Sequence, residues 1–189
     1  MGGPYLVFKV LESESPPTGA ESDSIFASVY EQHFTFVWRC LRSLGVSPAV
    51  LDDAAQDVFL VVHRRLATFE GSSSFRTWLF GIVRHVAFNY RRTVQRKTGR
   101  AQQLGGNLPS SAPSPHDNAE ANEVTAFIER FLASLDDKKR EVFALAVLEE
   151  LSIPEVAEAL GIPLNTAYTR LRRAREDFRR AFSERRLAP

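Results

Sequence analysis

The side chains best suited to binding a charged ligand lie near the C-terminus, in the sequence NTAYTRLRRAREDFRR. Eight arginines follow Thr166, and only three acidic residues accompany them. Guanidinium groups bind phosphate oxygens, and short polar side chains bind the edges of bases. This segment therefore predicts a nucleic-acid-binding surface, whose chemistry is recognition rather than catalysis.

The residues around this segment predict a helix-turn-helix. Apolar residues recur at helical spacing before and after Gly161-Ile162-Pro163, which breaks the helical pattern. The first helix is marked by Ile153, Val156, Ala157 and Leu160, and the second by Ala167, Leu171, Ala174 and Phe178. A helical hairpin also occurs without DNA binding, but the arginines of the second helix favour the DNA-binding form.

In a helix-turn-helix the start of the second helix enters the major groove, and arginines further along contact phosphate. The residues expected to contact bases are Asn165, Thr166, Thr169 and Arg172, with Tyr168 as a contact for a thymine methyl group. Those expected to contact mainly the DNA backbone are Arg170, Arg173, Arg175 and Arg180.

A second basic segment covers residues 71–116, which carry seven basic residues and no acidic one. A helix is predicted there, with Leu79, Ile82, Val83, Val86 and Tyr90 as its apolar stripe and Arg84, Phe88, Arg91 and Arg92 on the opposite side. Arginines interleaved with an aromatic ring suit single-stranded nucleic acid, because rings stack on exposed bases. Alternatively, Phe88 packs beneath a neighbouring helix.

A Gly/Ser loop leads into this helix through Phe75, Arg76 and Trp78. Small hydroxyl residues beside exposed rings suit a pocket for an unstacked base. The alternative is a helix cap with Phe75 and Trp78 as core anchors, and for Trp78 the core is favoured.

Acidic and amide residues gather near the start of an earlier helix, at Asp52, Asp53, Gln56 and Asp57. The apolar stripe of that helix is Leu51, Ala54, Ala55, Val58 and Val62. Negative charge suits a helix N-terminus, but capping accounts for only one or two of these residues. Since a polyanion would repel the acidic segments, we expect them to meet a different partner.

The chain as a whole predicts an all-α fold of two small helical domains joined by a flexible linker. Residues 1–23 are expected to be a disordered tail, 24–100 the first domain, 101–122 a proline-rich linker and 123–189 the second domain. Domains of this size are marginally stable alone, so contacts with partners matter to both.

Several classes of function are not expected. Cys40 is the single cysteine, which excludes an internal disulfide and a cysteine-based zinc site, and the four histidines lack metal-ligand spacing. No apolar run approaches the roughly 18 residues of a membrane span, and the N-terminal stretch MGGPYLVFKVLESESPPTG lacks the basic-then-apolar layout of a secretory signal, so we expect a cytoplasmic protein without membrane insertion. No nucleophile with its base, paired-carboxylate site or phosphate-binding glycine loop is present. We therefore expect no enzymatic activity, no cofactor and no metal.

Taken together, the segments resemble a bacterial sigma factor of the extracytoplasmic-function type, from Ile25 to Phe182. DDAAQDVFLVVHRRLATF is similar to the region two helix that binds RNA polymerase, and SFRTWLFGIVRHVAFNYRR to the segment that melts the promoter and binds its minus-ten element. LASLDDKKREVFALAVLEELSIPEVAEALGIPLNTAYTRLRRAR is similar to region four, which binds the minus-thirty-five element. Their order, and a linker without a third region, make the resemblance specific.

The resemblance implies that the chain binds core RNA polymerase and promoter DNA, as duplex upstream and as single-stranded non-template strand. By position, Asp53, Gln56, Asp57 and Phe59 would lie at or beside the polymerase contact, and Phe75, Trp78, Arg84, Arg91 and Arg92 in the melting segment. Proteins resembling this family are often held inactive by an anti-sigma factor. Two alternatives stay open: a stand-alone helix-turn-helix regulator, and a nuclease holding magnesium with Asp52, Asp53 and Asp57.

Overall fold

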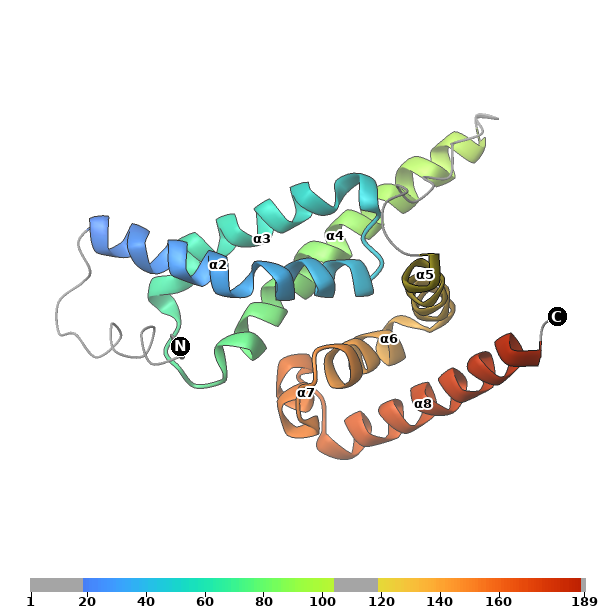
Figure 1. Ribbon diagram of the computed structural model, residues 1–189. Helices are drawn as coiled ribbons and strands as arrows, with labels where there is room; N and C mark the ends of the chain where they lie inside the picture. Colours follow the sequence, from blue (N-terminus) through green and yellow to red (C-terminus); the bar gives the residue numbers. More distant parts are fainter. Residues whose placement is uncertain (1–18, 104–118, 188–189) are drawn as a thin grey trace.

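The computed structural model describes residues 19–103 and 119–187, and side chains are described for residues 23–94 and 123–185. Over these residues the fold is all-α, as predicted, without a strand (Figure 1). The N-terminal bundle consists of α2 (Gly19–Ser43), α3 (Leu51–Arg65) and α4 (Phe75–Gln103). The C-terminal bundle consists of α5 (Ala119–Ser134), α6 (Asp137–Phe143), α7 (Ile153–Leu160) and α8 (Leu164–Leu187).

The N-terminal bundle forms because each of its three helices carries an apolar stripe toward the other two. Leu51, Ala54, Ala55, Val58 and Val62 of α3 are all buried, as their spacing predicted. On α4 the residues Leu79, Ile82, Val83 and Val86 are buried, and Tyr90 is partly buried. They pack with Val29, Phe36, Val37 and Leu41 of α2, so α3 and α4 are held by a common helix.

The helix-turn-helix is formed by α7 and α8. Ser152 and Glu155 form a capping box at the start of α7, which satisfies two backbone N–H groups that a helix start leaves free. At its end the N–H of Ile162 donates to the carbonyl of Ala157 (3.0 Å) and that of Gly161 to the carbonyl of Glu158 (3.0 Å). Gly161 has φ 62°, the left-handed conformation that this helix ending requires. The turn predicted at Gly161-Ile162-Pro163 is therefore confirmed.

The two bundles share a core. α7 packs against α4, and the π-helical turn Ala144–Leu148 contacts α2. Val142, Leu145, Val156 and Leu160 of the C-terminal bundle are buried in one cluster with residues of all three N-terminal helices. Figure 1 shows the short α7 lying beside the first turns of α4, while α8 lies on the outer side of the C-terminal bundle.

The helices extend into both segments that were expected to lack structure. α2 begins at Gly19, inside the predicted tail, while α4 continues to Gln103 and α5 begins at Ala119, inside the predicted linker. Alanine, glutamate and glutamine at these ends are good helix formers, so helical propensity extends past the last buried residue. The remainder of the predicted tail and linker, residues 1–18 and 104–118, lies outside the described residues.

We predict that Gly161→Ala lowers the free energy of unfolding by about 1 kcal/mol, because alanine is strained at positive φ. Gly81 is the matched control, since it lies in α4 at an ordinary helical conformation and a Cβ added there meets nothing within 4 Å. Gly81→Ala should raise stability by about 0.5 kcal/mol or more. Urea unfolding of both variants measures this, and equal effects would contradict the left-handed helix ending.

The capping box also predicts a pH dependence. Hydrogen bonds from the Ser152 hydroxyl (2.6 Å) and backbone N–H (2.9 Å) lower the pKa of Glu155. Because the folded-state pKa is depressed, the stabilisation is present above the usual glutamate pKa and is lost as the pH falls through the folded-state value. Glu155→Gln should therefore be less stable than the native chain by about 0.5–1 kcal/mol at pH 7, with the difference vanishing in acid. A difference independent of pH would contradict this.

Candidate functional site

The predicted base-contacting surface of α8 faces solvent. Tyr168 is 53% exposed, and the Arg172 side chain is 73% exposed, with only a weak contact to Glu176 (3.8 Å). Asn165, Thr169, Arg173, Arg175 and Arg180 are also exposed, and Thr166 and Arg170 are partly exposed. The opposite face of the helix, at Ala167, Leu171 and Ala174, is buried. α8 thus presents the predicted set of polar and basic side chains on one face.

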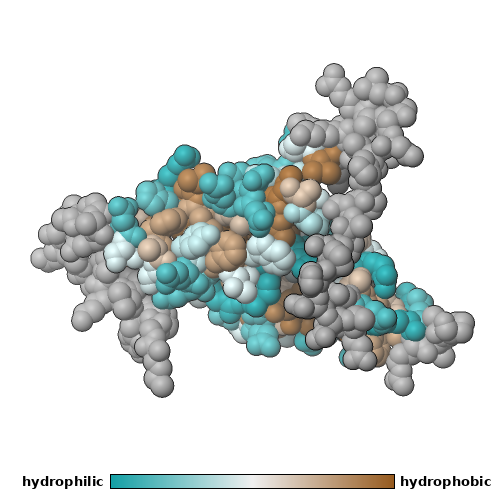
Figure 2. All heavy atoms as spheres, turned by 45° about the horizontal axis from the view of Figure 1, so that its top comes forward, coloured by the Kyte–Doolittle hydropathy of each residue, from teal (hydrophilic) through white to brown (hydrophobic). Residues whose placement is uncertain are grey.

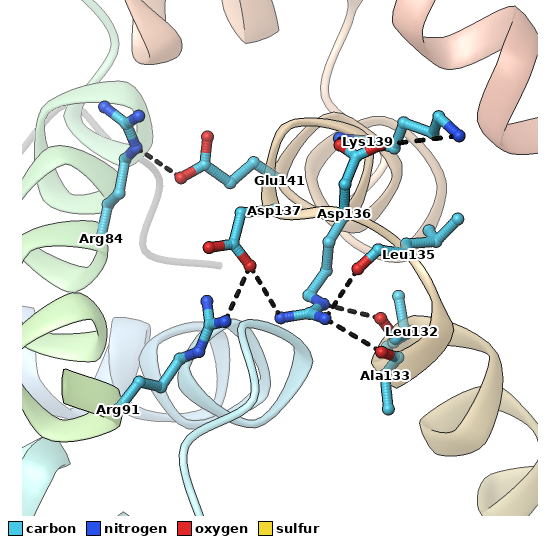
Figure 3. A network of polar contacts seen from close by, with 10 residues as sticks. Arg84, Arg91, Leu132, Ala133, Leu135, Asp136, Asp137, Lys139 and Glu141 are labelled. Carbon is cyan, nitrogen blue, oxygen red and sulfur yellow. Dashed lines mark hydrogen bonds and ion pairs between the residues drawn. The ribbon is translucent and has the colours of Figure 1, made fainter. Parts of the chain in front are cut away.

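On α4 the outward side is divided between free and paired residues. Phe88 is 58% exposed, so it does not pack beneath a neighbouring helix. Arg92 is also exposed. Arg84 and Arg91 instead extend toward α6 of the C-terminal bundle, where each meets a carboxylate (Figure 3). The aromatic ring of this surface is therefore accessible, whereas two of its three cations are occupied.

The start of α4 combines a helix cap with an aromatic cluster. The Ser74 hydroxyl accepts from the Thr77 backbone N–H (3.1 Å), as a cap does. Phe75 and Trp78 contact each other and Phe69, with ring centroids 5.3 Å apart, and both are partly buried. The sequence allowed either a pocket for an unstacked base or aromatic anchors in the core. Because Phe75 and Trp78 are partly buried against Phe69, the packing favours core anchors.

Arg76, the basic residue of this loop end, faces the C-terminal bundle. Its guanidinium lies over the Phe36 ring, 4.5 Å from the centroid, and donates to both the carboxylate and the carbonyl of Glu149 (3.2 Å each). The nearby His33 stacks against Phe75, and burial, followed by the charge of Arg76, lowers its pKa. Arg76 is thus paired with Glu149 rather than free, although its side chain remains 40% exposed.

The predicted acidic face of α3 borders an apolar hollow of about 460 Å³. Asp52, Asp53, Gln56 and Asp57 are all exposed. The hollow is lined by Phe26, Tyr30, Phe34, Asp52, Gln56, Phe59 and Leu60. Phe59 itself is only 3% exposed and forms part of its apolar wall. Figure 2 shows apolar surface interrupted by hydrophilic side chains over α2 and α3.

Two of these acidic residues also accept hydrogen bonds within the bundle: Trp38 Nε1 donates to Asp52 Oδ1 (3.4 Å), and the Tyr90 hydroxyl donates to Asp57 Oδ2 (2.7 Å). Desolvation and this hydrogen bond raise the pKa of Tyr90 to about 12. The bond ties α3 to α4, so Asp57 has a structural contact in addition to its predicted binding role.

Carboxylates of the C-terminal bundle pair with arginines of the N-terminal bundle. Arg84 Nε donates to Glu141 Oε1 (2.6 Å), and Arg91 Nη2 donates to Asp137 Oδ1 (2.7 Å). Arg42 of α2 pairs with Glu129 of α5. Sequence reasoning missed these contacts, although the alternation of basic and acidic segments was the signal that could have suggested them.

Glu149 is the most buried of these carboxylates, with a side chain only 1% exposed. It accepts from Arg39 Nε (2.9 Å) and Nη2 (2.7 Å) and from Arg76 Nη2 (3.2 Å). These hydrogen bonds hold the pKa of Arg39 above its usual value. Two arginines therefore compensate the burial of one carboxylate.

Arg140 is a buried arginine of the C-terminal bundle that contacts one of these carboxylates, Asp137. Its buried guanidinium donates to the carbonyls of Leu132 (2.6 Å) and Leu135 (2.8 Å) at the end of α5, and to Asp137 (3.1 Å) (Figure 3). Burial, and then the charge of Arg91, lowers the pKa of Arg140. Asp137 thus lies between two guanidinium groups, one from each bundle.

The nuclease alternative requires a three-carboxylate magnesium site, against which the described side chains can be compared. No three histidine, cysteine or acidic side chains within residues 23–94 and 123–185 are placed to hold an ion, so Asp52, Asp53 and Asp57 do not form a magnesium site. The arrangement of three carboxylates that the nuclease hypothesis requires is therefore not found in this part of the chain.

Among the described helices, none combines the length and apolar character needed to cross a membrane.

Both bundles match models of known protein families. Residues 29–97 match the model described as sigma-70 region 2, and residues 128–178 match the model described as sigma-70, region 4. The first match covers most of the N-terminal bundle, and the second covers the helix-turn-helix with the helices that support it.

Curated relatives span most of the chain. RNA polymerase sigma factor NccH of Alcaligenes xylosoxydans xylosoxydans is 31% identical over 153 residues, which cover 79% of this chain and 82% of NccH. ECF RNA polymerase sigma factor SigW of Bacillus subtilis (strain 168) is 28% identical and covers 75% of this chain and 79% of SigW. The solved structure of sigma factor RpoE with the anti-sigma factor NepR from Bartonella quintana has a TM-score of 0.65 at 23% identity, covering 82% of this chain and 97% of that chain.

Proposed function

This chain belongs to the sigma-70 family, in the extracytoplasmic-function group of RNA polymerase sigma factors, and we propose that its two bundles divide the work of recognising a promoter. As a sigma factor it directs RNA polymerase to a subset of promoters. In the proposal the N-terminal bundle is the domain that binds polymerase and opens DNA, and the C-terminal bundle is the domain that binds the upstream duplex. The observation that carries the proposal is the outward face of α8, which is rich in arginine and buries only its apolar side.

For duplex recognition, the first turns of α8 enter the major groove. Asn165, Thr166 and Thr169 lie on these turns and Arg172 follows one turn later, so their side chains reach base edges, with Tyr168 beside them for a thymine methyl group. Further along, Arg173, Arg175 and Arg180 contact phosphate, as does Arg170 on the flank. Phosphate contacts fix the position of the helix, and base contacts set its sequence preference.

For promoter opening, the exposed side of α4 captures the unpaired non-template strand. Phe88 stacks on a base, while Arg84, Arg91 and Arg92 neutralise phosphates, and Phe75, Arg76 and Trp78 border the strand at the start of the helix. Unstacking a base costs a few kcal/mol. Binding energy from polymerase and phosphate must therefore offset this cost, so the free chain binds promoters weakly.

Polymerase binds at the acidic face of α3. The hollow beside Asp52, Gln56 and Phe59 accepts an apolar side chain of the partner, and the carboxylates of Asp52, Asp53 and Asp57 meet basic residues around it. Charge of this sign would repel DNA, so this face is free for a protein. We place the protein in the cytoplasm with polymerase, as an initiation factor without enzymatic activity of its own.

An anti-sigma factor is the second protein partner in this proposal. RpoE, which shares the fold, was solved in complex with the anti-sigma factor NepR. A protein that covers both α8 and the acidic face of α3 would block DNA and polymerase together. The alternative of a stand-alone regulator instead requires tight binding of the free chain to a palindromic duplex.

The function is tested by transcription with purified core polymerase on fragmented genomic DNA of the source organism, with and without the chain, followed by mapping of transcript starts. We expect new starts that share two upstream elements at a fixed spacing. If no new start appears and the chain does not bind core polymerase, the sigma factor assignment fails. Tight binding to a palindromic duplex would then favour the regulator.

Phe88→Ala should reduce promoter opening by an amount equivalent to about 1–3 kcal/mol, because it removes a stacking platform for a base. Its exposure means that stability should change by less than about 0.5 kcal/mol. Permanganate reactivity of unpaired thymines in the polymerase complex measures opening, and thermal unfolding measures stability. Val124→Ala on α5, also exposed, is the control for loss of an apolar side chain outside the proposed DNA and polymerase surfaces. Unchanged opening in Phe88→Ala would contradict the assignment.

Arg172→Ala should weaken promoter use by about 1–3 kcal/mol and relax the preference at one upstream base pair, if Arg172 makes a bidentate guanine contact. Transcription from promoters with single substitutions in the upstream element measures this preference. Arg65→Ala, an exposed arginine at the end of α3, is the control and should leave the preference unchanged. Equal weakening on every sequence would instead assign Arg172 to phosphate.

A further inference from the structure

We infer that residues 5–14 of this chain bind back in the hollow between α2 and α3, where they compete with polymerase. The competition rests on the proposed function of that hollow, whereas the docking itself does not. Residues 5–14 lie outside the described residues. Their sequence, their short connection to α2 and the charges of α3 favour them as the occupant.

The hollow exposes apolar side chains beside polar ones, as binding surfaces do. Tyr30 of α2 and Leu60 of α3 are 41% and 47% exposed, and both line it. The Tyr30 ring lies 4.6 Å from the ring of buried Phe59, measured between centroids. The volume of about 460 Å³ lies within the range of roughly 300–1,000 Å³ that is usual for binding pockets. A short apolar segment therefore fits this hollow.

The N-terminal segment contains such an apolar run. Residues 5–10 read YLVFKV, in which Lys9 is the only charged residue. The charged residues between this run and α2 are Glu12 and Glu14. Burying the apolar run removes it from water, which is favourable wherever an apolar surface is available to receive it.

The hollow begins close to the point where this segment joins α2. α2 and α3 run antiparallel, side by side (Figure 1). At the start of α2, Asp23 lies 3.9 Å from His63, and the Phe26 ring meets the same imidazole edge-on. At the other end, Trp38 Nε1 donates to Asp52 (3.4 Å). A segment that turns back at the start of α2 therefore meets the C-terminal end of α3 first.

The charges of α3 and of the segment match in this direction. α3 is acidic in its first turn and basic in its last, and the exposed residues concerned are Asp52, Asp53, Arg64 and Arg65. Read back from α2, the segment carries Glu14 and Glu12 first and Lys9 last. Docking in this direction places the glutamates at the basic end of α3 and Lys9 at the acidic end. The opposite direction would bring like charges together at both ends.

The spacing of these charges also agrees. From Asp52 to Arg64 the helix rises about 18 Å. The extended chain from Lys9 to Glu14 spans about 17 Å. From Glu14 to Gly19 it reaches up to about 17 Å, more than the roughly 8–10 Å between the axes of packed helices. The connection is therefore long enough for the segment to turn back onto α3.

Docking and polymerase binding exclude each other, because both use the hollow and the acidic first turn of α3. Attachment to the same chain gives the segment a local concentration on the order of millimolar, so weak contacts suffice. If about four chains in five are docked, the apparent affinity for polymerase falls about fivefold. Polymerase, with its larger contact, then displaces the segment.

The first test is the affinity of the whole chain for purified core polymerase. Leu6→Ser combined with Phe8→Ser (the serine variant) removes two apolar side chains and should tighten binding about fivefold. The matched control, Ser13→Ala combined with Ser15→Ala, changes polar residues of the same segment and should alter affinity less than twofold. Equal affinity of the native chain and the serine variant would overturn the inference. Weaker binding by the serine variant would also overturn it, since the segment would then be part of the polymerase contact.

The second test detects docking without polymerase. A nitroxide on Gly3→Cys, with Cys40→Ala, should broaden the amide NMR signals of Asp52 and Asp53 more than those of Arg64, and the serine variant should abolish this difference. No broadening, or broadening confined to the end of α3 at Arg64, would contradict the docking. Broadening that appears only between a spin-labelled copy and a separate isotope-labelled copy would assign the hollow to a second chain and likewise overturn the inference.

A charge exchange tests the direction of docking. Glu14→Arg or Arg64→Glu alone places like charges together, and each should lower the docked fraction measured by the nitroxide about twofold. The two changes together should restore it. Arg64 lies outside the proposed polymerase and DNA surfaces, so the exchange leaves these unchanged. Absence of restoration would refute the proposed direction.

The two proposals can fail separately. If core polymerase binds none of these chains, the proposed polymerase site fails, and the nitroxide measurement still decides whether the segment docks. If polymerase binds the native chain and the serine variant equally and no broadening appears, only the docking fails.

Discussion

The arrangement of the two bundles depends on a buried carboxylate. Glu149, 1% exposed, would be unfavourable in its position without Arg39 and Arg76, because an isolated ion loses its hydration on burial. Both arginines come from the other bundle, so the C-terminal bundle can keep this side chain buried only while it remains in contact with α2 and α4. Separation exposes Glu149 to water, which replaces the lost hydrogen bonds. This charged anchor and the shared apolar core together hold the two bundles in contact.

The alternation of charge along the chain has two consequences. Basic segments attract DNA, and acidic segments between them attract those same basic segments when DNA is absent. In the structure Arg84 and Arg91 meet Glu141 and Asp137, whereas the arginines of α8 have no comparable partner across the bundles among the described side chains. Of the two proposed DNA surfaces, the one on α8 is therefore exposed, whereas two arginines of the one on α4 are paired.

Much of the fold could be predicted from residue spacing. The buried stripes at Leu51–Val62 and Leu79–Val86, and the turn at Gly161, followed from the period of the apolar residues and from glycine's tolerance of positive φ. The sequence did not decide whether Phe88 is exposed or buried, since a single aromatic residue on a helix occurs in either environment. The alternation of charge could have suggested that ion pairs join the two domains, but the pairs of Glu149 and Asp137 could not be predicted individually, because they depend on how the domains pack. The helices also extend further at Gly19 and Gln103 than the apolar spacing indicated, because the alanine, glutamate and glutamine residues near these ends favour helix.

The central claim is that the ion pairs of Glu149, Glu141 and Asp137 hold the two bundles in one fixed arrangement in the free chain. It is tested most directly by measuring the distance between spin labels placed at exposed Arg64 on α3 and Glu184 on α8, with buried Cys40 replaced by alanine. Pulsed electron resonance would compare the native chain with a variant that combines Asp137→Asn, Glu141→Gln and Glu149→Gln. The account predicts one narrow distance distribution in the native chain and a broader one in the variant. Equal widths in both proteins, or a broad distribution in the native chain, would contradict it.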